Sequence, residues 1–349
     1  MANTNKVSNK SEFTVAVETL AINHAALVRY LREKYGPNHD MKLPKFERLY
    51  DGLNPSDRVP LDPVSLGVTT MAQYLQEPNL GLVLSDYMEA HHQRILLFIN
   101  HCHFKFVDLL RMLARYVRIA SDVYDIQLEE TPEYLIVHYV PNAPDTVSYH
   151  QNEAFASILI RTLRAVKFAE VMKMDLAHAK PSVTDDQLYI QHYGLLPNFS
   201  AGHNKVYFSI ESRDLCITKS ASADESLRTL QELESRYVKV SNGDSFQKRC
   251  LFLLPLLLCL GEPNKEQLAE LLCVSPRTLQ RKLKEEGTGF RELLQQLRIE
   301  LSDHHFRKAK ASCTELAFAL GYRDYKQFHR AFKNWFGVTP EKYRDQVLS

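Results

Sequence analysis

The sequence predicts two domains, an N-terminal α+β domain and a C-terminal all-α domain with two helix-turn-helix units joined by a long helix. Three observations predict this architecture. The chain has 349 residues, more than one compact core usually holds. Lys+Arg outnumber Asp+Glu by 18 to 13 from Asp244 onward, whereas the preceding part has 25 against 29. The C-terminal part also contains an internal repeat, in which QLAELL (267–272) returns as ELAFAL (315–320).

The composition is that of a soluble globular protein, with 45% hydrophobic and 24% charged residues. Six scattered cysteines without a CxxC pair favour reduced thiols, as in the cytoplasm. The polar start MANTNKVSNKSEF lacks the apolar core of a signal peptide. The most apolar run, LFLLPLLLCL (251–260), contains a proline and is much shorter than the roughly 20 residues that span a bilayer. These observations predict a cytoplasmic protein without a membrane segment.

The elements of the N-terminal domain, residues 13–240, follow a flexible tail at 1–12. Residues 13–120 show mainly helical periodicity, clearest in FKFVDLLRMLARYVRI (104–119). Residues 122–141 alternate apolar and polar side chains and predict two strands that turn at 130–132. A helix over 153–172 and a strand over 203–211 complete the α+β pattern.

An amphipathic helix over 224–240 precedes the polar linker SNGDS (241–245), where we place the domain boundary. Its apolar line consists of Leu227, Leu230, Leu233 and Tyr237. Packing on its own domain is the favoured interpretation, because this line is too short for a firm coiled-coil prediction. A homodimer through this helix stays open as the alternative.

The C-terminal domain, residues 246–349, reads as helix, short turn, helix in each copy of the repeat. Both copies open with a capping box, Asn264 to Gln267 in the first and Ser312 to Glu315 in the second. Each second helix has its own start signal. These signals are Ser275-Pro276 in the first copy and Asp324 in the second, where Gly321 ends the preceding helix.

The second helix of each copy has one apolar face and one basic face. Leu279 and Leu283 are expected to dock inward in the first copy, opposite Arg277, Gln280, Arg281 and Lys284. The second copy docks Phe328, Phe332 and Trp335 and exposes Tyr325, Lys326, His329 and Arg330, with Lys333 beside them. Arginine can pair bidentately with guanine and glutamine with adenine in the major groove, so double-stranded DNA is the expected partner. A solvated helix with incidental basic residues explains either helix taken singly, but not two matching copies.

The C-terminal region resembles the DNA-binding domain of AraC-type bacterial transcription regulators. The resemblance rests on LAELLCVSPRTLQRKLKEEGTGFRELL (268–294) and ELAFALGYRDYKQFHRAFKNWFGVTPEKYR (315–344). It implies that a long helix, about 290–310, presents both reading helices to one face of promoter DNA, and that RNA polymerase is a partner. Arg323 stands where the family often has a small hydroxyl residue, and Tyr325 and Lys326 are also less standard, which leaves the second half-site preference open.

The upstream part resembles, more loosely, the effector-sensing domain of one AraC subfamily, mainly over residues 96–130. The resemblance implies a small-molecule effector of unknown identity. Neither the effector residues nor the choice between activation, our working assignment, and repression can be read from the sequence.

Several signals are rejected as sites. The histidines at 91–92, 101–103 and 304–305 are neighbours that cannot share one helix face, so no metal and no cofactor are expected. No phosphate-binding glycine loop, nucleophile elbow or HExxH motif is present in the sequence, which argues against an enzyme. Two alternatives remain: a basic protein-docking module without DNA specificity, and a degenerate enzyme-like ligand-binding domain.

Overall fold

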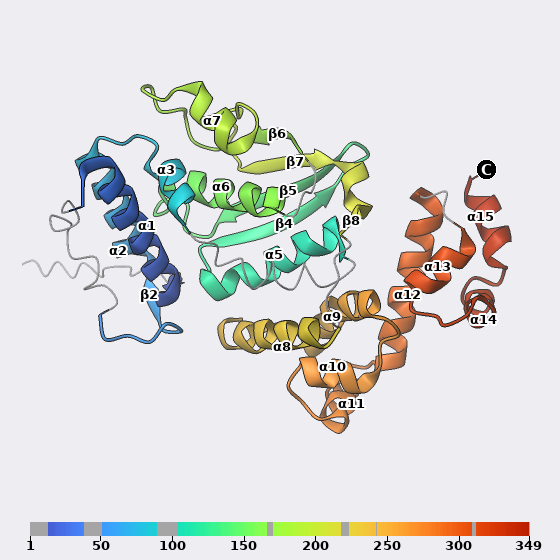
Figure 1. Cartoon of the computed structure of the whole chain (residues 1–349). Helices are drawn as coiled ribbons and strands as arrows, with labels where there is room; N and C mark the ends of the chain where they lie inside the picture. The colour runs from blue at the N-terminus through green and yellow to red at the C-terminus, as the bar shows by residue number, and fades with distance from the viewer. Residues whose placement is uncertain are drawn as a thin grey trace, which may run out of the picture. The chain divides into compact units, whose positions relative to one another are not determined.

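The computed structural model describes residues 13–37, 51–88, 104–165, 170–217, 223–241, 243–308 and 312–348. The chain forms two compact units, the first ending at Leu215 and the second running from Cys216 to the C-terminus (Figure 1). The tail expected at 1–12 and the histidines at 91–92 and 101–103 lie outside the described residues. In the described part of the chain, no helix is long and apolar enough to cross a bilayer.

A four-stranded antiparallel sheet, in the order β4-β5-β7-β6, is the centre of the first unit. Its strands are β4 (Tyr124–Glu130), β5 (Tyr134–Pro141), β6 (Val171–Asp175) and β7 (Lys205–Ser209). The alternation at 122–141 predicts the β4–β5 hairpin, in which Leu128 opposes Val137. Four further strands are short: β1 (Thr14–Ala16), which pairs with β2 (Arg58–Pro60), and β3 (Phe104–Lys105) and β8 (Cys216–Ile217).

Helices α5 (Phe106–Ala120) and α6 (Tyr149–Ala165) pack on the same face of this sheet. The ring of Phe106 meets that of Phe208 with 5.1 Å between centroids, and the ring of Phe155 meets that of Tyr139 at 5.1 Å. Phe208 opposes Leu135, which lies on the same side of β5 as Tyr139 because side chains alternate along a strand. Helix α7 (Asp186–Tyr193) and a 3₁₀ helix (Ile210–Asp214) complete the unit.

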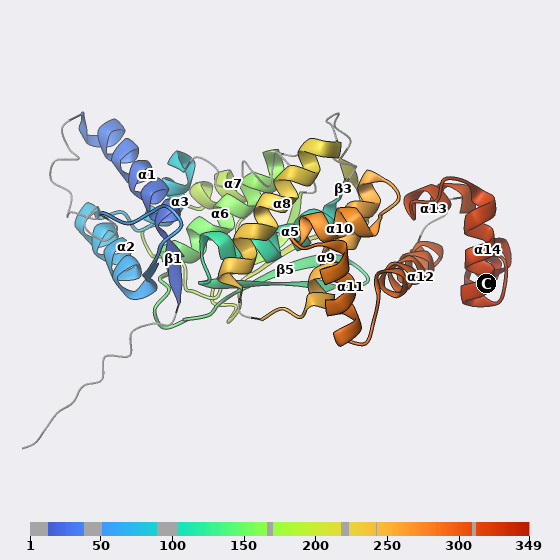
Figure 2. The same cartoon turned by 90° about the horizontal axis from the view of Figure 1, so that it is seen from below.

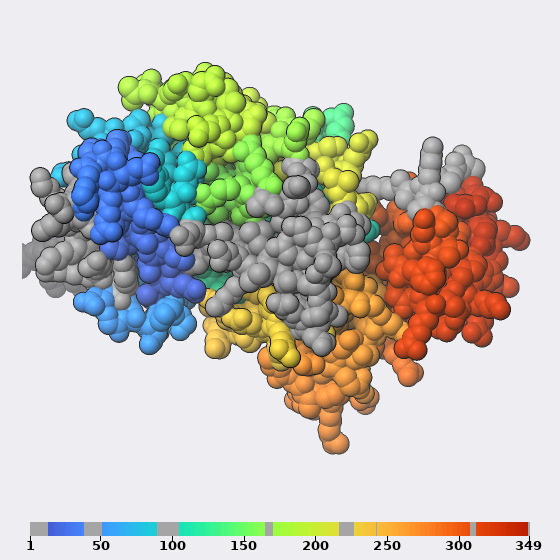
Figure 3. All heavy atoms as spheres, viewed as in Figure 1, coloured from blue at the N-terminus to red at the C-terminus, as the bar shows by residue number. Residues whose placement is uncertain are grey.

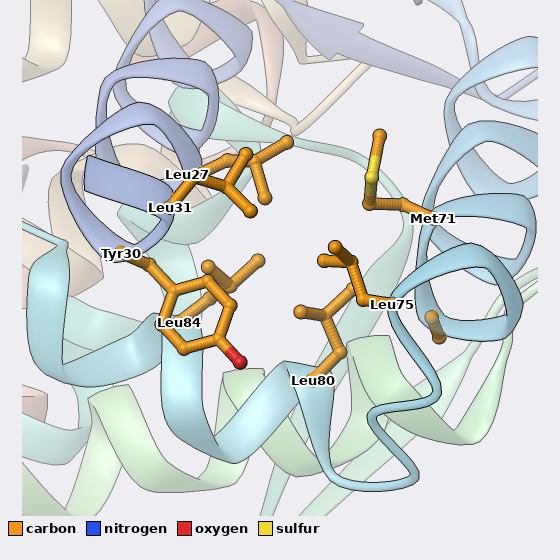
Figure 4. Close-up of a cluster of buried hydrophobic side chains, with 8 residues drawn as sticks. Leu27, Tyr30, Leu31, Met71, Leu75, Leu80 and Leu84 are labelled. Atoms are coloured by element: carbon orange, nitrogen blue, oxygen red, sulfur yellow. The ribbon is translucent and has the colours of Figure 1, made fainter. Parts of the chain in front are cut away.

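The first three helices form a separate apolar cluster, shown in Figure 4. They are α1 (Val17–Tyr35), α2 (Leu61–Leu75) and α3 (Leu80–Tyr87). Leu31 of α1 and Leu80 of α3 are almost completely buried where the helices meet. The helices approach closely at α3, where a Cβ on Gly81 would lie 1.8 Å from the backbone oxygen of His150 in α6. Glycine is therefore required at this position.

A buried polar network joins α6 to the loops around it. The carboxylate of Glu153 is fully buried and accepts a hydrogen bond from the hydroxyl of Tyr189 at 2.7 Å. The side-chain nitrogen of Asn79 and the ring of His178 complete its partners, at 3.4 and 3.2 Å. Burial, followed by the charge of Glu153, raises the pKa of Tyr189. The network satisfies a group that would otherwise be costly to bury.

The second unit consists of eight helices among its described residues (Figure 2). They are α8 (Ala223–Val240), α9 (Phe246–Leu260), α10 (Lys265–Leu271), α11 (Pro276–Glu285), α12 (Phe290–Lys308), α13 (Cys313–Ala319), α14 (Tyr325–Phe336) and α15 (Pro340–Leu348). The apolar run 251–260 forms part of α9, in which Leu253 and Leu254 are fully buried. Helix α12 matches the long joining helix that the sequence predicts.

Two segments differ from the sequence analysis. The helix expected over 153–172 ends at Ala165, and Val171 already belongs to β6, where it pairs with Phe208. Helix α8 groups with the helices that follow it rather than with the domain before it, so the units divide upstream of the expected linker at 241–245. The reason is a buried ion pair, in which the Nε of Arg249 in α9 donates to the carboxylate of Glu234 in α8 at 2.9 Å.

Candidate nucleic-acid interface

The two copies of the repeat form two helix-turn-helix modules, α10–α11 (the first module) and α13–α14 (the second module). Both capping boxes are present. The backbone N–H of Gln267 donates to the side chain of Asn264 at 2.8 Å, and that of Glu315 donates to the hydroxyl of Ser312 at 3.2 Å. Each first helix therefore begins at the residue that the local sequence predicts.

The turns of the two modules use equivalent residues. Cys273 in the first module has φ +55°, and Gly321 in the second has φ +74°, so both lie in the left-handed region. Ser275 then caps α11 by accepting from the N–H of Thr278 at 3.1 Å. Asp324 caps α14, and the bond from the backbone N–H of Gln327 is the main reason why the pKa of Asp324 is lowered.

The inner face of each second helix is docked as expected. Leu279 and Leu283 of α11 are fully buried, and so are Phe328 and Phe332 of α14. Trp335 is half-buried and packs against the same cluster as Phe332. This docking fixes which side of each helix is available to a partner.

The four predicted residues of α11 all lie on its exposed side: Arg277, Gln280, Arg281 and Lys284. The space-filling view shows the α11 region, in orange, projecting at the lower edge (Figure 3). Arg281 donates to Glu285 one turn away at 2.6 Å, with both side chains more than half exposed. An exposed pair of this kind stabilises by only about 0–1 kcal/mol, so the guanidinium can exchange it for another acceptor.

Three of the five predicted residues of α14 are exposed: Lys326, Arg330 and Lys333. His329 is half-buried, with its ring 5.9 Å from that of Tyr325. Tyr325 was expected to point outward, but it is half-buried against the core of the second module, and its hydroxyl donates to Glu341 of α15. Burial, with this bond, raises the pKa of Tyr325. In this structure Tyr325 joins α14 to α15.

The structure adds polar residues that the sequence analysis did not select. Gln327 is exposed on α14, next to Lys326 and one turn before Arg330. Arg291 is exposed in the first turn of α12, directly after α11. Helical spacing from Arg330 could have identified Gln327. Arg291 gave no such signal, because it belongs to a different helix.

In the described part of the chain, no group of three or more His, Cys, Asp and Glu residues is placed to hold a metal ion. The interface consists of basic and amide side chains on two short helices. These groups can contact phosphates and donate to base edges in the major groove.

Comparison with protein families gives two matches. Residues 268–346 match a helix-turn-helix domain model. Residues 51–215 match the model of the arabinose-binding domain of AraC transcription regulator, N-terminal part. The two matches cover the helix-turn-helix modules and most of the first unit.

Several known proteins are similar over most of the chain. A protein of Mycobacterium tuberculosis, named an uncharacterized HTH-type transcriptional regulator, is 26% identical over 259 residues, which are 68% of this chain and 70% of that protein. The ornithine utilization regulator of Pseudomonas aeruginosa is 23% identical over 280 residues, which are 77% and 79% of the two chains. The crystal structure of the transcriptional regulator CdpR from Pseudomonas aeruginosa covers 93% of this chain and 98% of its own, with a TM-score of 0.51 and 19% identity, and shows a likeness of fold.

Proposed function

We infer that this chain, which is a DNA-binding transcription regulator of the AraC family, reads promoter DNA with the outer faces of α11 and α14. One observation carries this proposal. Two modules with the same caps and the same buried inner face expose basic and amide side chains at equivalent positions, Arg281 and Arg330 among them. Two reading helices on one unit suit a bipartite site in successive major grooves.

Base reading is assigned to Arg277, Gln280 and Arg281 on α11, and to Lys326, His329 and Arg330 on α14. Lys284 and Lys333 lie at the C-terminal ends of their helices and are proposed as phosphate contacts. Tyr325 is proposed to act on DNA indirectly, because its hydroxyl is already bonded to Glu341 and fixes the start of α14.

Selection of bound sequences from a random duplex pool tests the base readers. Arg281→Ala and Arg330→Ala should each weaken binding to the selected sequence by about 1–3 kcal/mol and relax the preference at one base position. Arg228→Ala is the matched control, since it removes an exposed arginine from α8, outside both modules. If both reader variants select the unaltered sequence, these helices do not read bases.

The phosphate contacts are tested by salt dependence. Lys284→Ala and Lys333→Ala should weaken binding to all sequences alike. Each should also reduce the slope of log affinity against log salt by about 1, because one fewer counterion is released. A change in the preferred bases would instead make these lysines base readers.

We further propose that a small-molecule effector bound by the first unit modulates this activity, on the strength of the match at 51–215. A thermal-shift screen of metabolites against the full chain tests it, because a ligand of the folded state raises apparent stability. A hit that leaves DNA affinity unchanged would separate binding from regulation. Conversion of the hit to a product would support the degenerate-enzyme alternative.

The remaining partners are proposals as well. RNA polymerase would be recruited by a DNA-bound activator, and pull-down in the presence and absence of the selected DNA distinguishes that role from docking without DNA. A homodimer would need a surface other than the apolar line of α8, because Leu230, Leu233 and Tyr237 are already buried within one chain. Sedimentation of the full chain tests it, and a monomer at high concentration removes it.

A further inference from the structure

The two modules contact each other through a seam that neither helix-turn-helix requires. The seam lies between the loop joining α9 to α10 and the turn joining α13 to α14. At Gly321, in that turn, a Cβ would lie 3.1 Å from the backbone oxygen of Gly261 and 3.2 Å from the Cα of Glu262. The backbones of the two modules are therefore close enough that a single methyl group is felt.

Arg298, in the middle of α12, bridges this seam. Its Nε donates to the backbone oxygen of Leu320 at 3.0 Å. Its guanidinium also lies over the ring of Tyr322, with the central carbon 4.2 Å from the ring centroid. Leu320 is the C-cap of α13, where carbonyl oxygens lack partners within the helix. Arg298 thus supplies a hydrogen bond and a cation–π contact to the second module.

A second ion pair at the seam contributes much less. Arg323 pairs with Glu262 at 3.3 Å, but its side chain is 82% exposed. Solvent screens such a pair, and its net stabilisation is small. Arg298 is half-buried, so its contacts are the stronger polar link across the seam.

Helix α12 holds the second module at two points. At its C-terminal end, the ring of Phe306 packs on Phe332 at 5.6 Å, and Asp303 accepts from Tyr343 at 2.6 Å. Arg298 lies eight residues before Phe306, a distance of about 12 Å along the helix axis. One anchor leaves the module free to rotate about it, whereas two anchors fix its rotation.

We infer that Arg298 is a positioning residue that fixes the rotation and separation of α14 relative to α11, and thereby the spacing between half-sites that the protein accepts. Each base pair changes the half-site separation by about 3.4 Å and rotates one site by roughly 35° about the duplex. A rigidly joined pair of modules cannot follow that change, and a loosely joined pair can. This inference rests on the proposed function of α11 and α14.

Binding to duplexes of altered spacing tests the inference with the full chain. The two half-sites are first selected from a random pool with the unaltered protein, and one base pair is then inserted or deleted between them. The unaltered chain should lose about tenfold or more in affinity for either altered duplex, because simultaneous engagement is lost. Arg298→Met keeps the side-chain length and removes the donor and the charge. It should lose less than about threefold.

Control variants separate positioning from other effects. Arg291→Met changes an exposed arginine on the same helix, and any lost phosphate contact weakens all spacings alike, so its spacing ratio should equal that of the unaltered chain. Tyr322→Leu removes the ring beneath Arg298 and should lower the ratio to an intermediate value. It also provides the test if Arg298→Met does not fold. Duplexes with a single half-site should bind the unaltered chain, Arg298→Met and Tyr322→Leu alike.

The outcomes distinguish the two proposals. If the unaltered chain selects no sequence, the proposed function fails. If it discriminates spacing, and folded Arg298→Met discriminates equally, the proposed function stands and the positioning role of Arg298 is overturned. An unaltered ratio in folded Tyr322→Leu would overturn the role of the cation–π contact in that positioning.

Discussion

Gly321→Ala should destabilise the second module more than the same change at Gly337. The two glycines have nearly the same backbone conformation, φ +74° and +73°. They differ in surroundings, since an added Cβ at Gly321 would lie 3.1 Å from both the Gly261 oxygen and the Leu258 Cδ2, whereas nothing lies within 4 Å at Gly337. The pair therefore separates the cost of contact from the cost of conformation.

The expected magnitudes follow from these two terms. A left-handed conformation costs a non-glycine residue about 1 kcal/mol, and this is the whole cost expected for Gly337→Ala. Forcing a methyl group into a close-packed contact typically adds about 1–3 kcal/mol. Gly321→Ala should thus lower the free energy of unfolding by about 2–4 kcal/mol.

Urea unfolding followed by the fluorescence of Trp335 measures this difference. Trp335 is the single tryptophan of the chain and lies in α14, so its signal reports on the second module. The midpoint should fall further for Gly321→Ala, with the slope unchanged. Equal destabilisation by the two variants would refute the reasoning, because the seam would then be too loose to feel a methyl group.

Three further changes test other parts of the structure. Cys273→Gly should stabilise the chain by about 0.5–1 kcal/mol, because Cys273 has φ +55°; a lower melting temperature by circular dichroism would contradict this. Glu234→Ala should cost about 3–5 kcal/mol in urea unfolding by leaving Arg249 with its buried carboxylate partner removed, and a loss below about 1 kcal/mol would show that solvent replaces the partner. Burial raises the pKa of Asp175, but hydrogen bonds from neighbours including Asn198 and Tyr207 outweigh it and hold the pKa at about 2. Since this pKa is depressed on folding, its contribution is full above about pH 4 and is lost as pH falls through about 2; Asp175→Asn should flatten acid unfolding in that window, and an unaltered profile would exclude this carboxyl as its cause.

Much of the second unit follows from the sequence. The caps at Asn264 and Ser312 act over three residues, and the docked faces of α11 and α14 repeat every three to four residues. Such signals are local and can be read without knowing the fold. The internal repeat then turned two ambiguous basic helices into one expectation of DNA binding. The first unit was less accessible, because β6 pairs with a distant strand and carries only a short apolar pattern.

The sequence by itself determined the two-domain architecture, the two helix-turn-helix modules and the basic face of each reading helix. Only the tertiary structure decided that Tyr325 bonds to Glu341 and that Arg298 joins the modules by bonding to the backbone of Leu320. The partners of these two bonds are 16 and 22 residues apart in the chain. Capping and periodicity act within one or two turns of helix, so they fix the modules themselves. The contacts that set one module against the other depend on side chains that meet only after the helices have packed.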